Sequence, residues 1–259
     1  MPDPLSTLVA ASALHGAADT LFAAAVLLVA YAVFGMTGFG SALIAVPVLA
    51  HLWPLATLVP MIALFEIASA LLVGGSQRHA VDLREAGGLV PFMLAGIAAG
   101  ALLLVAAPPR WLVAGLGVFV MAYGLRGVLA RERGFRRVPR WWAAPFGLVG
   151  GVVSSLFGTG GSFYVIHLAG RLEDKSALRA TLSAVLGTSN AIRLCAFLAS
   201  GLLLPAVTAT AALLLPVVLL GLWLGMRLHD RVSRAVLMRA VCLLLVPAGL
   251  SLVVRAIAG

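Results

Sequence analysis

A few polar residues stand inside long apolar runs of this chain of 259 residues, and their chemistry suits an anion. Arg193 falls in a predicted helix over residues 178–199, and Ser189 and Asn190 can share its face. A planar guanidinium donates two parallel hydrogen bonds to two oxygens of an oxyanion such as a sulfonate or sulfite. Arg193 could instead snorkel to the outer interface, so a substrate or gating role and an interfacial role both stay open.

Two titratable residues accompany this arginine. Glu66 is the only acid well inside a predicted span, residues 56–74. It could act as a proton-coupling carboxylate, neutralise Arg193, or serve only in local capping or packing. His167 lies in a short apolar segment, either as a hydrogen-bonding or titrating group of a site or as a satisfied interior residue.

Two glycine-rich breaks offer a second kind of anion chemistry. They are FGMTGFGSALIAVPVL, residues 34–49, and SSLFGTGGSFYVIHLAG, residues 154–170. A helix starting after each turn presents free backbone N–H groups and the positive end of its dipole, and glycine lets a ligand come close. Two such ends converging would bind an anion without a buried cation. Alternatively, the glycines serve only tight turns and close packing.

The elements that must position these residues are membrane helices. Hydrophobic residues make up 62% of the chain and charged residues 10%, which is typical of a polytopic membrane protein. The net charge of +9 resides in short loops, so a nucleic-acid partner is not expected. The N-terminus lacks the basic start of a signal peptide. Cys195 and Cys242 fall inside apolar runs, and we predict neither a disulfide, a metal site nor a cofactor.

The chain is internally repeated. Gly40-Ser41 aligns with Gly161-Ser162, and Ser69 with Asn190, at an offset of 121 residues. The predicted organisation is an N-terminal extension (1–17), a first membrane repeat (18–130), a basic cytoplasmic linker (126–140) and a second membrane repeat (141–257). At an offset of 125 residues the pairs include GIAAG and GLWLG, whose small residues allow close helix packing.

Loop charges indicate how the broken segments lie. If each crossed the membrane once, the basic residues would divide almost evenly between the two sides, against the positive-inside rule. If each enters and turns back as a hairpin, most basic residues face the cytoplasm and the two halves become inverted repeats. The first leg is nevertheless long enough to cross fully. The hairpin arrangement places Arg78, Arg84, the linker, Arg171, Lys175, Arg179, Arg227, Arg231 and Arg234 in the cytoplasm, and Arg110 and Arg255 outside.

The paired signatures GMTGFGSALIAVPVL and GLVGGVVSSLFGTGGSFYVIHLAG resemble the TauE/SafE family of membrane permeases, also called the sulfite exporter family, over about residues 18 to 257. This resemblance implies secondary transport of small sulfur-containing anions, such as sulfite, sulfoacetate and other sulfonates, commonly as export from bacteria. Departures include Leu168, where the family often has a proline. The motif positions that carry over are Gly38, Phe39, Gly40, Ser41 and Pro47, then Gly158, Gly160, Gly161 and Ser162.

We therefore predict an all-α integral membrane protein of two inverted repeats, each a glycine-broken helical hairpin followed by three transmembrane helices. It would export a small anion across the bacterial inner membrane by alternating access, with the lipid bilayer around it and a homodimer left open. The predicted substrate-binding residues are Gly38, Phe39, Gly40, Ser41, Gly160, Gly161, Ser162, His167, Asn190 and Arg193, with Glu66 for coupling.

Two alternatives come from other classes. A membrane-embedded enzyme acting on a lipid phosphate would need acids clustered with His, Ser or Arg at the hairpins, and these hairpins offer Ser, Gly and one His. An anion channel would need a continuous pore with charged or carbonyl-lined constrictions, which a sequence does not reveal. A cation transporter should carry more intramembrane acids than one.

Overall fold

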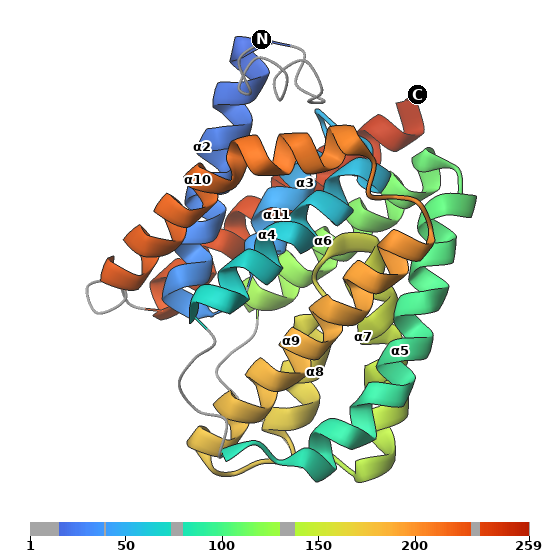
Figure 1. Cartoon of the computed structure of the whole chain (residues 1–259), viewed down its shortest axis with the longest axis vertical. Coiled ribbons are helices and arrows are strands. Elements are labelled where there is room, and N and C mark those ends of the chain that lie inside the picture. The colour runs from blue at the N-terminus through green and yellow to red at the C-terminus, as the bar shows by residue number, and fades with distance from the viewer. Residues whose placement is uncertain (1–15, 39, 74–79, 130–137, 229–233, 259) are drawn as a thin grey trace, which may run out of the picture. The chain divides into compact units, whose positions relative to one another are not determined.

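Every regular element in the described part of the chain is helical (Figure 1). The structure is a computed structural model that describes residues 16–38, 40–73, 80–129, 138–228 and 234–258. Phe39, most of the N-terminal extension and most of the basic linker lie outside these residues. An all-α fold follows from long apolar runs, because a helix satisfies its own backbone hydrogen bonds in lipid.

Seven of the helices are long and apolar enough to cross a membrane: α2, α4, α5, α6, α9, α10 and α11. The prediction of an all-helical integral membrane protein is thus confirmed. The elements are α2 (Ala17–Thr37), α3 (Ser41–Leu49), α4 (Leu55–Val73), α5 (Leu83–Ala106), α6 (Pro109–Leu129), η2 (Arg140–Trp142), α7 (Ala143–Phe157), α8 (Gly161–Ala169), α9 (Lys175–Ala199), α10 (Pro205–Leu228) and α11 (Arg234–Ala258).

The helices group into two compact units, and each unit draws on both predicted repeats. Unit 1 holds α2, α3, the start of α4 up to Phe65, α6, α10 and α11. Unit 2 holds α4 from Glu66 onward, α5, η2, α7, α8 and α9. Chain order therefore does not separate the two units, and each is described by itself below.

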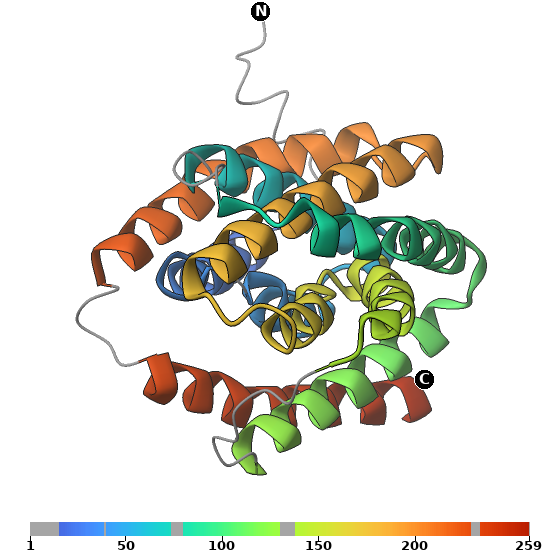
Figure 2. The same cartoon turned by 90° about the horizontal axis from the view of Figure 1, so that it is seen from below.

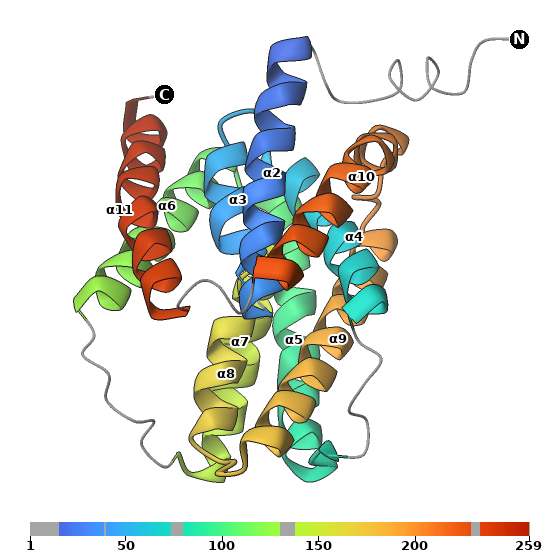
Figure 3. The same cartoon turned by 90° about the vertical axis from the view of Figure 1, so that its left-hand side faces the viewer.

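In unit 1, α2 packs along α10 and α6 packs along α11, as Figures 2 and 3 show for the second pair. Glycines allow both contacts. A side chain on Gly35 of α2 would meet the backbone of Leu222 and Gly225 in α10. A side chain on Gly117 of α6 would meet Gly249 of α11. Such close approach is typical of helix pairs in membranes, where small residues let backbones touch.

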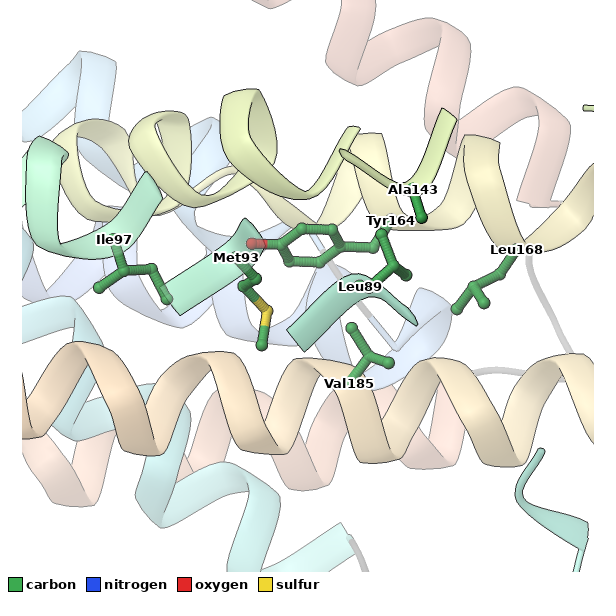
Figure 4. Close-up of a cluster of buried hydrophobic side chains, with 7 residues drawn as sticks. All are labelled: Leu89, Met93, Ile97, Ala143, Tyr164, Leu168 and Val185. Atoms are coloured by element: carbon green, nitrogen blue, oxygen red, sulfur yellow. The ribbon is translucent and has the colours of Figure 1, made fainter. Parts of the chain in front are cut away.

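In unit 2, α5 packs along α7 through glycines of the GIAAG segment. A side chain on Gly96 would run into the backbone of Leu148 and Gly151, which confirms the predicted packing role. Beside this seam lies an apolar core (Figure 4), in which the Tyr164 ring lies alongside Met93 and Leu89. The core consists of Leu89, Met93, Ile97, Ala143, Tyr164, Leu168 and Val185.

Both predicted breaks separate two helices, at the predicted places. After α2, Gly38 and Gly40 have φ values of 80° and 97°, a left-handed conformation that L side chains rarely adopt, and α3 begins at Ser41. After α7, Gly158 takes φ 73°, and α8 begins at Gly161. The legs differ in length, since α2 has 21 residues and α7 has 15. At 1.5 Å per residue α7 is roughly 22 Å long, short of the about 30 Å hydrocarbon layer.

Candidate anion-binding site in unit 2

Arg193 is buried, with 1% of its surface exposed, and does not reach an interface as the snorkelling alternative required. One of its terminal nitrogens, Nη1, donates to Glu66 Oε2 at 3.0 Å. The same nitrogen is 3.4 Å from Asn190 Oδ1 and 3.5 Å from Ser154 Oγ. Of the roles left open for Glu66, the structure therefore shows the neutralising partner of Arg193.

The other two guanidinium nitrogens of Arg193 have no hydrogen-bond acceptor among the described residues. These are Nε and Nη2, whose N–H groups point the same way and form the side-on fork of an arginine. Buried donors are nearly always paired, because an unpaired one loses its hydration without compensation. The open fork therefore matches a bound group with two acceptor oxygens.

Arg171 shows what the same fork does when it is occupied. Its Nε donates to Glu85 Oε2 at 3.2 Å and its Nη2 donates to Glu85 Oε1 at 2.7 Å. This carboxylate raises the pKa of the Arg171 guanidinium through the hydrogen bonds and its charge. In Arg193 all three acceptors contact Nη1 instead, so Nε and Nη2 are left without an acceptor among the described residues.

The hydroxyl groups close to this arginine are those of Ser154 and Tyr164. Ser154 Oγ lies 3.3 Å from Ser189 Oγ, within hydrogen-bond distance, and so links α7 to α9. Tyr164 Oη is buried without a hydrogen-bond partner of good geometry among the described residues, and so is Ser155 Oγ, but Ser155 packs against Gly100 of α5. Tyr164 faces Ser189 and Arg193. Hydroxyl groups can donate to an anion without adding a charge.

The α7–α8 turn lies against the same serine. A side chain on Gly160 would run into Gly150 O and Ser154, so only glycine allows this approach. A side chain on Gly161 would meet Leu186 of α9 at 2.9 Å. The start of α8, with Ser162 buried in its first turn, therefore lies in the neighbourhood of Ser154 and α9. The N–H groups of Ser162 and Phe163 already donate to Thr159 O and Gly160 O, at 3.4 Å and 3.0 Å.

The matching turn of unit 1 is simpler. Ser41, the first residue of α3, is buried, and its hydroxyl has no partner among the described residues. The far end of α3 is tied down by Arg255, whose Nη1 donates to Ala50 O at 3.1 Å. His51 contacts Ser251 there, with 3.1 Å between Nε2 and Oγ. The unit 1 turn thus supplies backbone donors and one hydroxyl.

His167 has other neighbours than the Arg193 cluster. It is fully buried on α8, six residues after Gly161 and so about 9 Å along the helix. Its ring packs on Phe146 with 5.9 Å between centroids, and the charges it senses are those of Glu85 and Arg171. The structure therefore does not bring His167 together with Arg193 and Asn190.

Sequence reasoning missed most of the hydroxyl groups at this site. Ser154 stands in the quoted motif, before the second glycine turn, yet the prediction drew only on the glycines, Ser162 and His167 of that motif. The missed signal is polarity inside an apolar leg, because polar residues within membrane segments are rare and face the protein interior. Tyr164 gave no such signal, since an aromatic residue on an apolar helix is ordinary core.

Seven apolar helices of membrane-spanning length, with a buried ion pair inside unit 2, are typical of a polytopic membrane protein. The chain belongs to the TauE/SafE family: residues 22–252 match the family described as "Sulfite exporter TauE/SafE". This confirms the predicted family.

One curated relative is similar to most of the chain. This is the "Probable inner membrane transporter protein TsaS" of Comamonas testosteroni, with 29% identity over 194 residues, which cover 74% of this chain and 81% of the relative. No solved structure matches the chain. Family and relative are both transporters, which favours transport over the membrane-enzyme alternative.

Proposed function

We propose that this multi-pass inner-membrane transporter carries a small sulfur-containing oxyanion, such as a sulfonate or sulfite, and that Arg193 binds it through Nε and Nη2. The observation that carries the proposal is the open, buried fork, which has no acceptor among the described residues. Two oxygens of a sulfonate or sulfite group match its spacing. The family description points to the same class of substrate.

The surrounding groups suit the rest of such an anion. Tyr164, which lies near Ser189 and Arg193, holds a buried hydroxyl with no partner of good geometry among the described residues, and α8 begins close to Ser154. A sulfonate has a third oxygen beyond the two that a guanidinium fork takes, and neutral donors can bind it without further charge. We assign the third oxygen to these donors and to the Gly160–Ser162 turn. Gly38, Gly40 and Ser41, in unit 1, remain predictions of anion contact from the sequence.

We further propose alternating access between two inverted repeats, with export as the direction. A reciprocal packing supports it: the first helix of each repeat packs on the fourth helix of the other, α2 on α10 in unit 1 and α7 on α5 in unit 2. Equivalent elements in equivalent pairs are what a duplicated transporter fold requires. The hairpin topology of the broken segments stays a prediction, to be tested by cysteine accessibility at residues 171–179.

Arg193→Lys is the test variant, because lysine keeps the positive charge beside Glu66 and removes the planar fork. Purified protein is titrated calorimetrically with methanesulfonate, sulfoacetate and sulfite, and proteoliposomes are assayed for uptake of the anion that binds best. We expect Arg193→Lys to weaken binding at least about ten-fold and to slow uptake in parallel, with little loss of thermal stability.

The matched control is Arg126→Gln, at an exposed position of α6, which should bind as the wild type does. Acetate and formate complete the panel, since they offer two oxygens where a sulfonate offers three. Wild-type protein that binds none of the sulfur oxyanions, or Arg193→Lys that binds them unchanged, would show that the site is assigned wrongly.

A further inference from the structure

The ion pair between Arg193 and Glu66 sets the charge of the site before any substrate arrives. The two side chains are 1% and 10% exposed, and Nη1 and Oε2 are 3.0 Å apart. A hydrogen bond of this length between a guanidinium and a carboxylate is charge-assisted. The buried pair is therefore neutral as a whole, and Arg193 does not offer an uncompensated positive charge.

No second cation offsets Glu66 within the described part of unit 2. The other buried acid of this unit, Glu85, is taken by Arg171 through two hydrogen bonds. The remaining groups around Arg193 are the amide of Asn190 and hydroxyls, which are neutral. An anion on the Arg193 fork thus brings its entire charge into a buried, formally neutral site.

We propose, resting on the function proposed above, that Glu66 makes this site selective for anions with a single negative charge. A monoanion such as methanesulfonate, or hydrogensulfite in the case of sulfite, adds one charge, which the fork, the neighbouring hydroxyls and the start of α8 stabilise. A dianion of the same shape, such as sulfate, adds two charges beside an ionised carboxylate. Like charges at short range in a poorly hydrated site repel strongly, and the second charge meets no second cation.

Glu66 is thus a specificity-determining residue that acts through the net charge around Arg193. Glu85, the other buried glutamate among the described residues of unit 2, is as buried as Glu66 but binds Arg171. The chain therefore contains its own control. Both of these buried glutamates of unit 2 pair with an arginine, but only the partner of Glu66, Arg193, has an open fork.

The test compares methanesulfonate with sulfate, which share a tetrahedral sulfur and differ in charge. Calorimetric titration at one pH and constant ionic strength uses wild type, Glu66→Gln and Glu85→Gln. We expect the wild type to bind methanesulfonate at least about ten-fold tighter than sulfate. Glu66→Gln should shrink this ratio at least about five-fold, mainly by tightening sulfate, and Glu85→Gln should leave the ratio unchanged.

Folding is checked for each variant by thermal unfolding, and Glu66→Asp, which keeps the charge, should keep the wild-type preference. Sulfate binding to the wild type as tightly as methanesulfonate overturns the inference, and so does an unchanged ratio in Glu66→Gln. If Arg193→Lys leaves both affinities intact, the proposed site itself fails. Loss of both affinities in Arg193→Lys with an unchanged ratio in Glu66→Gln refutes only the role of Glu66.

Discussion

Both glycine turns begin with a left-handed glycine that ends the preceding helix, Gly38 after α2 and Gly158 after α7, but their surroundings differ. In unit 1, the buried hydroxyl groups among the described residues are those of Ser41, Thr210 and Tyr31. Unit 2 holds every buried charged side chain of the described chain and most of the buried hydroxyls. The comparison teaches that a glycine turn by itself does not define the chemistry of a site. What distinguishes unit 2 is the arginine that a neighbouring helix places beside the turn.

Aligning the two predicted repeats pairs the two glycine turns with each other, but pairs Glu66 and Arg193 with uncharged residues. At the offset of 121 residues, Leu72 corresponds to Arg193 and Gly187 corresponds to Glu66. Leu72 is 64% exposed, as a lipid-facing residue would be. The helix starts and the packing glycines therefore recur in both predicted repeats, whereas among the described residues the buried Glu66–Arg193 pair occurs once.

The largest expected effect comes from removing Arg193. Arg193→Gln leaves Glu66 buried without a counterion, which should cost about 3–5 kcal/mol of folding stability. The double variant with Glu66→Gln should recover most of that stability, because both charges are gone, and still bind no anion. Thermal unfolding and calorimetric titration of the same samples separate these two effects. A single variant as stable as the wild type would contradict the ion pair.

Alanine substitutions in the two turns should cause smaller losses of stability, for a different reason in each turn. Gly160→Ala should cost about 1–3 kcal/mol, because a side chain there meets Ser154 and Gly150, although its φ of −60° suits any residue. Gly40→Ala has free space but φ 97°, and should cost about 1 kcal/mol.

Asparagine and alanine should rank in opposite order at these two positions. It tolerates the left-handed region better than alanine, so Gly40→Asn should be milder than Gly40→Ala. It is larger than alanine, so Gly160→Asn should be worse than Gly160→Ala. Apparent melting temperatures of the four variants give the comparison. The same order of alanine and asparagine at both positions would show that the two turns do not differ as described.

The smallest effect concerns the serine beside each turn. Ser154→Ala removes a hydroxyl that bonds Ser189 and lies near Arg193, and should weaken anion binding by about three- to ten-fold, or about 1 kcal/mol. Ser41→Ala should weaken it no more than about two-fold. Titration with methanesulfonate measures both. Equal losses would mean that the unit 1 turn takes an equal part in binding.

Local chemistry made much of the fold predictable. Glycine clusters at residues 38–40 and 158–161 predicted the helix breaks, because glycine tolerates left-handed backbone and close approach. Arg193 stood out because charge is rare inside apolar helices. Leu168, the departure from the family pattern, is explained by the apolar core of unit 2, where its side chain is fully buried.

Other features depend on contacts between distant residues and could not be read from spacing. Glu66 and Arg193 are 127 positions apart, and their pairing required the packing of separate helices. His167 was grouped with the site because it shares α8 with Gly161, yet the helix carries it to the Glu85–Arg171 pair. Which nitrogens of Arg193 stay open likewise follows from three-dimensional positions alone.

The ion pair has an evolutionary consequence. It joins α4, in the predicted first repeat, to α9, in the predicted second repeat. A buried charge that lacks its partner destabilises a protein severely, so neither Glu66 nor Arg193 is expected to persist for long without the other. Members of the family that have lost the arginine are thus expected to have lost the glutamate as well, and the two positions are inherited as one character.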